Sequence, residues 1–320
     1  MKAAIYTRYG GPEVVSIKEL PIPQITPDQL LIKVHTTTVN RTDTGFRSAQ
    51  YVVSRLFSGL WKPKKQILGC EFAGEIVETG ANISKYNIGD RVFGFDDRDF
   101  GGHAEFKCLS ERGAIGLIPS NLTYTEAAAL TEGSHYALVQ LRAAKIKPGD
   151  HVLVYGATGA IGSAAVQLLK EWGAVVVAVS NSKNVELVRS LGADEVIDYQ
   201  TQDFRRTAHR FDLVLDAVGK SSFGICKTLL KPKGVYISTE LGHRGENVWR
   251  SILTRYSKGK RILFPIPSIT PEDVTYLARL AEKGAFKPVI DRHYPLSEIV
   301  EAHRYVDTGS KTGNVVITMQ

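Results

Sequence analysis

The chain has 320 residues, a length that favours about two domains. Residues of the AVILMFWYC set make up 43% of it and another 29 residues are glycine, which excludes a disordered chain, a collagen repeat and a small disulfide-stapled scaffold. The formal net charge of +7 attracts anions, including phosphorylated cofactors, and permits weak nucleic-acid binding.

Cysteine usage and the N-terminus bear on where the protein works. Cys70, Cys108 and Cys226 are widely spaced and form no Cys-x-x-Cys pair, so they indicate neither a zinc knuckle nor a disulfide framework. The first apolar run is too short for a signal peptide, and the uncharged run 152–169 is interrupted by three glycines. We therefore predict a cytoplasmic protein without a membrane span.

Roughly the first 120 residues contain short apolar or alternating runs separated by prolines, a pattern typical of β-strands. An antiparallel, barrel-like block is the simplest arrangement for them. The expected strands are 2–7, 14–20, 29–39, 71–78, 91–95 and 105–109.

From about residue 123 strands alternate with helices, which predicts a parallel, doubly wound sheet with right-handed crossovers. After residue 288 strands return. We therefore predict a discontinuous first domain, 1–122 with 286–320, an inserted dinucleotide-binding domain, 123–285, and a ligand in the gap between them. The expected strands are 151–155, 174–179, 195–197, 211–216, 235–238, 261–264, 289–294 and 314–318, and the expected helices include 160–172, 183–191 and 296–306.

The most informative motif is a glycine-rich turn that follows strand 151–155 and opens a helix. Gly156 permits a tight turn, Gly159 lets the backbone approach a pyrophosphate, and Gly162 lets the helix pack closely on the strand. The phosphate would bind at the helix N-terminus, where free N–H groups and the helix dipole favour an anion. The alternative is a tight strand–helix turn without a ligand. The predicted cofactor-binding residues here are Gly156, Ala157, Thr158, Gly159, Ala160, Ile161 and Gly162.

The end of the next strand bears on which dinucleotide binds. An NAD-binding domain usually carries Asp or Glu about 20 residues after the last glycine, whereas this chain has Ser180 there and no carboxylate in 179–183. Ser180 and Lys183 are suited to contact a 2′-phosphate, which favours NADPH over NADH. Alternatively, Ser182 caps the following helix and Lys183 is solvated, and both interpretations can hold together.

Further motifs are spread along nearly the whole chain: LGCEFAG at 68–74, KPGD at 147–150, SLGADEVIDY at 190–199, DAVG at 216–219 and KTGNVV at 311–316. Together they resemble the medium-chain dehydrogenase/reductase superfamily, in particular its zinc-free quinone oxidoreductase (zeta-crystallin-like) branch. The resemblance implies an α/β fold, with a GroES-like β-barrel catalytic domain and an inserted doubly wound Rossmann domain. It also implies a homodimer, joined at the edge strand around 261–264.

The resemblance also bears on metal binding. Zinc-dependent relatives carry a cysteine near the position of Asn40 and a Gly-His-Glu run where this chain has Gly-Cys-Glu. The three cysteines are too few for the four-cysteine zinc lobe of such relatives. We therefore expect no metal. An improvised site, in which Cys70 joins Glu71, Asp43 or His103, is the alternative.

Without zinc, the resemblance implies hydride transfer from a nicotinamide to a quinone or to the β-carbon of an enone or alkenal. A hydrogen-bond donor would stabilise the negative charge that develops on the acceptor oxygen, and solvent would supply the final proton. Asn40 and Tyr51 match the first and last residues of the family's substrate loop, so they are the predicted catalytic residues. Alternatively, Asn40 only caps a turn and Tyr51 only packs in a lid.

Other residues are assigned to the cofactor by their match to the family. Tyr199 would cover the adenosine phosphate, the segment of Ala217, Val218 and Gly219 would pass the ribose, and Leu241 would approach the nicotinamide. Ser134 or His135 would stand in for a nicotinamide-contacting threonine. Lys311 either helps to bind phosphate or is a surface residue.

Two other functions remain open at this point. The first is a zinc-dependent alcohol dehydrogenase. The second is a non-catalytic NADPH-binding sensor with a nucleic-acid or membrane-surface partner, suggested by five basic and no acidic residues in 250–261. The leading hypothesis is a reductase of a small-molecule electrophile that binds no nucleic acid.

Overall fold

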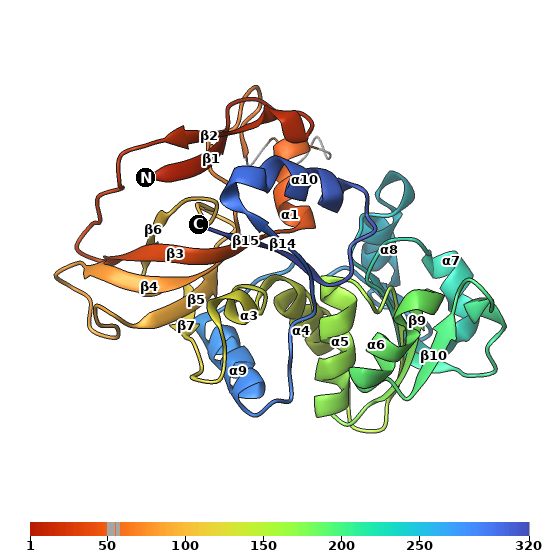
Figure 1. Cartoon of the computed structure of the whole chain (residues 1–320). Helices are drawn as coiled ribbons and strands as arrows, with labels where there is room; N and C mark the ends of the chain where they lie inside the picture. The colour runs from red at the N-terminus through yellow and green to blue at the C-terminus, as the bar shows by residue number, and fades with distance from the viewer. Residues whose placement is uncertain (50–54, 56–57, 320) are drawn as a thin grey trace. The chain divides into compact units, whose positions relative to one another are not determined.

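The computed structural model describes residues 1–49, 55 and 58–319, which form two compact units (Figure 1). The first combines Met1–Glu132 with Ile269–Gln320, and the second is Gly133–Ser268. The predicted boundaries at 123 and 285 assign helices 124–128 and 271–282 to the second unit, whereas both belong to the first. The later helix packs on a strand of the first unit, where a Cβ at Gly116 would come within 2.9 Å of Val274 Cγ1.

The first unit is built mainly from antiparallel strands. They are β1 (Lys2–Tyr6), β2 (Val15–Glu19), β3 (Gln29–Val39), β4 (Glu71–Thr79), β5 (Arg91–Phe95), β6 (Phe106–Ser110), β7 (Ala114–Leu117), β14 (Ile290–Pro295) and β15 (Asn314–Thr318). Strand β3 is central, because it pairs with β4, β6 and β15. Leu30, Ile32 and Val34 of β3 are buried with Phe72 and Ile76 of β4 in one hydrophobic core.

Two further details of this unit concern one edge of its sheet and a strand that was not predicted. Strand β14 runs parallel to β15, so the sheet is mixed at that edge. Strand β7 was not predicted, because it has only four residues and one of them is glycine. The helices of the unit are α1 (Arg41–Ser48), α3 (Tyr124–Ala128), α9 (Pro271–Glu282) and α10 (Ile299–Asp307). Helices α1 and α10 lie side by side, joined by an ion pair of 2.6 Å between Arg47 and Asp307 (Figure 1).

The second unit is a parallel sheet of six strands. They are β8 (His151–Tyr155), β9 (Val175–Ser180), β10 (Glu195–Asp198), β11 (Phe211–Asp216), β12 (Leu230–Ser238) and β13 (Arg261–Leu263), in the order β10-β9-β8-β11-β12-β13. The chain passes outward from β8 to β10 and then returns to the other side of β8 at β11, as in a doubly wound fold. The carboxyl ends of β8, β9, β11 and β12 therefore lie at one edge of the sheet. The helices are α4 (Glu132–Ala144), α5 (Ala160–Glu171), α6 (Val185–Ser190), α7 (Phe223–Cys226) and α8 (Glu246–Thr254).

The uncharged run 152–169 forms most of β8, the glycine turn and most of α5. Among the helices that the structure describes, none combines the length and the apolar character that a membrane crossing requires.

Candidate functional site

The glycine turn has the conformation that its sequence predicts. Gly156 has φ +83°, a region that favours glycine, and Gly159 precedes α5 as its N-cap residue. A Cβ at Gly162 would lie 2.1 Å from the carbonyl oxygen of Gly156, so only glycine lets α5 approach the turn this closely. A Cβ at Gly159, in contrast, would meet no atom nearer than 3.9 Å. Space next to Gly159 and the free N–H groups of the first turn of α5 suit a bound phosphate.

The other predicted cofactor residues of the second unit lie next to this turn. A Cβ at Gly156 would come within 2.5 Å of Val218, which places the segment of Ala217, Val218 and Gly219 against the turn. A Cβ at Gly219 would lie 2.2 Å from Glu240, the neighbour of Leu241. The structure therefore brings β8, β11 and the residues after β12 together at one edge of the sheet.

The Asp216 carboxylate shapes the loop that follows β11. It accepts hydrogen bonds from the backbone N–H groups of Val218, Lys220 and Ser221 and from the hydroxyl of Tyr236. Burial raises the pKa of Asp216, and these hydrogen bonds to the charged form oppose that shift. Asp216 is therefore a buried acceptor that fixes the backbone of the loop after β11.

Ser134 and His135 belong to the first turn of α4, and their side chains are only 1% and 2% exposed. The preceding Gly133 lies against the turn, where a Cβ would be 2.4 Å from the carbonyl oxygen of Ala160. The start of α4 and the start of α5 are thus in contact. A role of either side chain toward a nicotinamide stays a prediction.

The end of β9 differs from the predicted 2′-phosphate site. Ser180 is 1% exposed and its hydroxyl donates to the carbonyl oxygen of Asn181, so its side chain is not available at the surface. The helix that follows is capped by Asn181, which accepts from the N–H of Asn184, and not by Ser182. Lys183 is exposed, as predicted for either of its two roles.

Two neighbours of Ser180 complete this region. Tyr199, 53% exposed, donates its backbone N–H to the carbonyl oxygen of Ser180. Asp198 lies beside Ser180 in the pairing of β9 with β10 and accepts from the hydroxyl of Ser182. The sequence reasoning missed this carboxylate, because it comes from the adjacent strand and not from the end of β9. Hydrogen bonds from Ser182 and from the Gln200 N–H lower the pKa of Asp198.

The first unit contains a buried polar cluster, formed by Thr38, Asn40, Thr42, Asp43, Cys70, Glu71, Thr131, Glu132 and Lys311. The Glu71 carboxylate accepts five hydrogen bonds. Its Oε1 accepts from the N–H and hydroxyl of Thr131, at 2.9 and 2.8 Å, and from the N–H of Glu132 at 2.7 Å. Its Oε2 accepts from the hydroxyl of Thr38 at 2.6 Å and from Nδ2 of Asn40 at 2.7 Å. Glu71 thus joins β3, β4 and the segment 131–132 within the first unit.

Asn40, a predicted catalytic residue, is 2% exposed and is the N-cap residue of α1. Its backbone N–H donates to Asp43 Oδ2 at 2.9 Å, and Asp43 Oδ1 accepts from the N–H of Gly69, also at 2.9 Å. The asparagine and the aspartate three residues later therefore start the helix and fix it to the segment before β4.

Glu132 is the least satisfied member of the cluster. Its Oε1 accepts from the hydroxyl of Thr42 at 2.6 Å, whereas its Oε2 is buried without a hydrogen-bond partner among the described residues. Burial, followed by the nearby charges of Asp43 and Glu71, raises the pKa of Glu132 to about 8. This carboxyl therefore holds a proton at neutral pH. Burial lowers the pKa of Lys311, which lies beside Asn40 and is half-buried; its role toward a phosphate stays a prediction.

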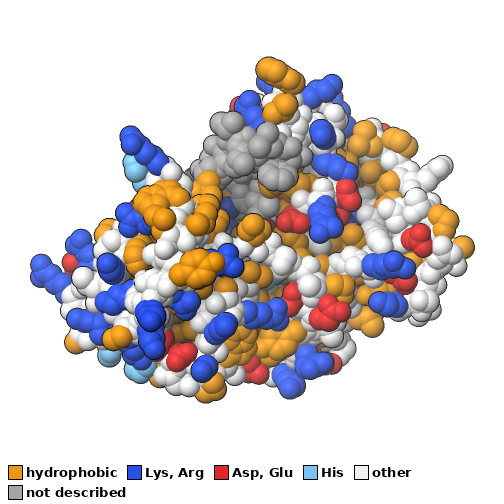
Figure 2. All heavy atoms as spheres, turned by 180° about the vertical axis from the view of Figure 1, so that it is seen from behind, with side chains coloured by type: hydrophobic (Ala, Val, Ile, Leu, Met, Phe, Trp, Pro, Cys, Tyr) orange, Lys and Arg blue, Asp and Glu red, His pale blue; other side chains and the backbone are white. Residues whose placement is uncertain are grey.

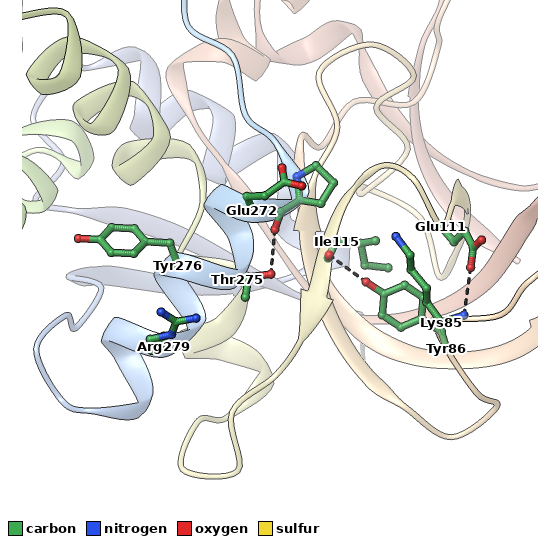
Figure 3. Close-up of a pocket in the computed structure, with 9 residues that line it drawn as sticks. Lys85, Tyr86, Glu111, Ile115, Glu272, Thr275, Tyr276 and Arg279 are labelled. Atoms are coloured by element: carbon green, nitrogen blue, oxygen red, sulfur yellow. Dashed lines mark hydrogen bonds between the residues drawn. The ribbon is translucent and has the colours of Figure 1, made fainter.

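Tyr51, the other predicted catalytic residue, lies outside the described residues. One hollow formed by the described residues is not at the predicted site. It lies between α9 and the strands of the first unit, has a cavity volume of about 470 Å³, and includes none of the predicted site residues (Figure 3). Its lining carries both signs of charge. The lining residues are Lys85, Tyr86, Glu111, Ile115, Pro271, Glu272, Thr275, Tyr276 and Arg279.

Comparison with known proteins places this geometry in a family. Residues 26–123 match the alcohol dehydrogenase GroES-like domain, and residues 191–317 match a zinc-binding dehydrogenase domain. The chain is 32% identical to a 2-methylene-furan-3-one reductase of Solanum lycopersicum, over 99% of this chain and 79% of that protein. The chain belongs to the medium-chain dehydrogenase/reductase superfamily.

Two further relatives place it in the zeta-crystallin-like quinone oxidoreductase branch. A chloroplastic NADPH-dependent alkenal/one oxidoreductase of Arabidopsis thaliana is 29% identical, over 99% of this chain and 79% of that protein. The solved quinone oxidoreductase of Coxiella burnetii is 31% identical, with a TM-score of 0.87 over 100% of this chain and 99% of that one. This medium-chain reductase is therefore an oxidoreductase with the GroES-like and Rossmann folds that its sequence predicts.

The name of the family model that matches residues 191–317 implies zinc. The buried polar cluster of the first unit, however, does not fit the zinc centre of that family. The Oδ1 atom of Asn40 already accepts from the ammonium of Lys311 at 3.1 Å, so a cation occupies that side of the amide. Burial, followed by the Asp43 charge, raises the pKa of Cys70 well above its usual value and so disfavours the thiolate that zinc requires. Ligand-type atoms of Asp43, Cys70 and Glu132 lie within 4.8 Å of one another, but both oxygens of Asp43 already accept backbone N–H groups.

The two other candidate ligands of the improvised metal site, His103 and Glu71, do not suit a metal ion either. His103 is 1% exposed, and its Nε2 lies 2.8 Å from the carbonyl oxygen of Thr38. Both oxygens of Glu71 accept hydrogen bonds, so binding a metal there would leave buried donors without acceptors. The cluster is thus organised by hydrogen bonds and by the charge of Lys311.

Proposed function

We propose that this chain is an NADPH-dependent, zinc-independent reductase that transfers hydride to a quinone or to an α,β-unsaturated carbonyl compound. The observation that carries the proposal is the glycine turn, with space beside Gly159, in a chain whose buried polar cluster does not fit the zinc centre of alcohol dehydrogenases. The names of its relatives, a furanone reductase, an alkenal/one oxidoreductase and a quinone oxidoreductase, support the acceptor class.

The reduced nicotinamide, when bound, supplies the hydride. The chain's own contribution to cofactor binding comes from the carboxyl edge of the second unit's sheet. Backbone N–H groups at the start of α5 would bind the pyrophosphate, and the close packing that Gly162 allows holds them in place. Ala217, Val218, Gly219 and Leu241 would line the path of the ribose and nicotinamide, because they adjoin the turn.

The preference for NADPH rests on Lys183 and Tyr199. Both are exposed near the end of β9, so an ammonium and a phenol are available to a 2′-phosphate. Ser180 makes no such contribution through its buried hydroxyl. Lys183→Glu should raise the KM for NADPH more than tenfold and change the KM for NADH little, because only the former carries the 2′-phosphate. Equal effects on the two cofactors would contradict the assignment.

A panel of acceptors tests the reaction. Purified enzyme should oxidise NADPH in the presence of a quinone, an alkenal or a cyclic enone, and not in the presence of a simple saturated aldehyde. NADPH labelled with deuterium at the transferable position should place deuterium on the β-carbon of the enone. Tight NADPH binding without turnover of any acceptor would exclude the proposal and favour a sensor.

We further propose a homodimer joined along β13 and α8. Strand β13 is at the edge of its sheet, and α8 with the segment after it exposes Ile252 (66%), Leu253 (72%) and Tyr256 (87%). Sedimentation should give twice the chain mass, and Leu253→Glu should give the monomer. A monomeric wild type would contradict the arrangement.

The basic segment 250–261 does not by itself call for a nucleic acid. Arg250 lies 3.4 Å from Glu246 and also over the ring of Trp249. On the face shown in Figure 2, lysine and arginine side chains are interspersed with uncharged and acidic ones. We propose a small-molecule electrophile as the partner. The cytoplasm is the proposed location, supported by the three free cysteines and tested by cell fractionation.

A further inference from the structure

The amide of Asn40 has no hydrogen left to donate. An asparagine Nδ2 carries two hydrogens, and here they are directed to Thr38 Oγ1 at 2.9 Å and Glu71 Oε2 at 2.7 Å. Both acceptors are buried, and breaking either bond would leave Glu71 or Thr38 under-satisfied. A donor to the acceptor oxygen of a substrate must therefore come from another residue.

Lys311 is a neighbour of Asn40 that still has donor capacity. An ammonium carries three N–H groups. Nζ of Lys311 donates to Asn40 Oδ1 at 3.1 Å and to the carbonyl oxygen of Gly313 at 2.6 Å. These two bonds fix the position of Nζ and leave a third N–H group. The Lys311 residue as a whole is half-buried.

Lys311 also supplies a positive charge next to the acidic residues of the cluster. Asp43, Glu71 and Glu132 are buried carboxyl groups. The charges of Glu71 and Asp291, and that of Glu132 once it is ionised, favour the charged form of Lys311, against the effects of burial and of Arg41. A fixed ammonium in partly buried surroundings interacts strongly with a negative charge that forms next to it, because little water screens the interaction.

We propose that Lys311 is a catalytic residue, whose free N–H group donates a hydrogen bond to the carbonyl oxygen of the acceptor. This inference rests on the proposed function and deepens it. When hydride adds to the β-carbon of an enone, the π electrons move to the carbonyl oxygen and form an enolate. Lys311 stabilises that oxygen and keeps its own proton, and solvent supplies the proton that completes the product. Asn40 is then a positioning residue, which holds Nζ through its Oδ1.

The test compares Lys311→Met with the wild type on an enone. Removing one preorganised donor to an oxyanion is expected to lower kcat by about 10²–10³-fold. Because the cofactor residues lie in the second unit, the Kd for NADPH should stay within about twofold. Lys283→Met, which changes an exposed lysine at the C-cap of α9, is the matched control and should retain full activity.

A series of enones of increasing oxygen basicity separates donation from a structural role. If Lys311 donates to the carbonyl oxygen of the enone, the loss of kcat in Lys311→Met should depend on the basicity of that oxygen. The slope of log kcat against oxygen basicity should then differ between the variant and the wild type. Parallel slopes would overturn the inference. In Lys311→Ala, added methylammonium should restore part of the activity, and ethylene glycol should not.

Failure of the inference and failure of the proposed function give different results. If the wild type reduces no acceptor, the proposed function fails. If the wild type is active and Lys311→Met keeps its kcat, only the role of Lys311 is wrong. Should the methionine variant not fold, Lys311→Arg takes its place. It keeps the charge but moves the N–H groups, so a slope equal to that of the wild type would again overturn the inference.

Discussion

The glycine turn of the second unit and the buried polar cluster of the first differ in how their parts are distributed along the chain. The turn consists of seven consecutive residues and acts through its backbone. The cluster joins 38–43, 70–71, 131–132 and Lys311, and it acts through side chains. A local sequence pattern, such as the glycine turn, therefore specifies backbone geometry. A side-chain network, in contrast, depends on which distant segments the fold brings together.

The largest expected effect is on the cluster. Glu71→Gln should lower the free energy of unfolding by about 3 kcal/mol, because an –NH₂ group would replace an oxygen that accepts from at least two buried donors. Urea unfolding measures the loss. Glu78→Gln, an exposed change on the same strand, is the control and should be neutral. A loss no greater than that of the control would show that the network adds little to stability.

In the glycine turn, Gly162→Ala should lower the free energy of unfolding by about 1–3 kcal/mol. The added Cβ would lie 2.1 Å from the carbonyl oxygen of Gly156, so α5 must move away from the turn. The matched variant is Gly159→Ala, at a position with φ −72° and no atom within 3.9 Å of the new Cβ. Equal melting temperatures for the two variants would contradict the close packing assigned to Gly162.

Gly159→Ala should instead weaken cofactor binding. A methyl group in the space beside the turn would keep a pyrophosphate from the backbone, and a tenfold higher Kd for NADPH corresponds to about 1.4 kcal/mol. Calorimetric titration measures the Kd. A wild-type Kd in this variant would show that the space next to Gly159 is not where the phosphate binds.

The effect expected to be smallest over a single pH unit is a pH dependence of stability that originates at Glu132. Its pKa is raised from 4.5 to about 8, so between these pH values the folded chain keeps a proton that the unfolded chain releases. Stability contributed by this group therefore falls as the pH rises through that range, by on the order of 1 kcal/mol per pH unit. Urea unfolding at several pH values should show a weaker decline for Glu132→Gln, whereas Glu78→Gln should follow the wild type. A decline in Glu132→Gln as steep as in the wild type would mean that the carboxyl is ionised in the fold.

Most elements of both units were predictable from local patterns. Strands β3, β5, β8, β11 and β15 have the predicted bounds, because each is a run of apolar or alternating residues between turn residues. The domain boundaries could not be read in this way. Helices α3 and α9 follow the alternating texture of the second unit, yet they pack on strands of the first.

The candidate site was predictable only in part. The glycine turn, Lys183 and Tyr199 carry local motifs, whereas the burial of Ser180 depends on its neighbours in the sheet. Glu132 was missed. A glutamate after the apolar run 127–130 is a weak indication of a buried acid, and its neighbours Asp43 and Glu71 lie far away in the sequence.

The sequence by itself determined the family, the two folds and the cofactor turn, because a tight backbone geometry needs particular residues at consecutive positions. Only the tertiary structure decided what the polar residues of the first unit do. It showed that both hydrogens of the Asn40 amide are used, that Oε2 of Glu132 is buried without a partner among the described residues, and that Lys311 lies beside Asn40. The physical reason is that a side chain's donors, acceptors and charge depend on its contacts, and these contacts join residues up to 271 positions apart.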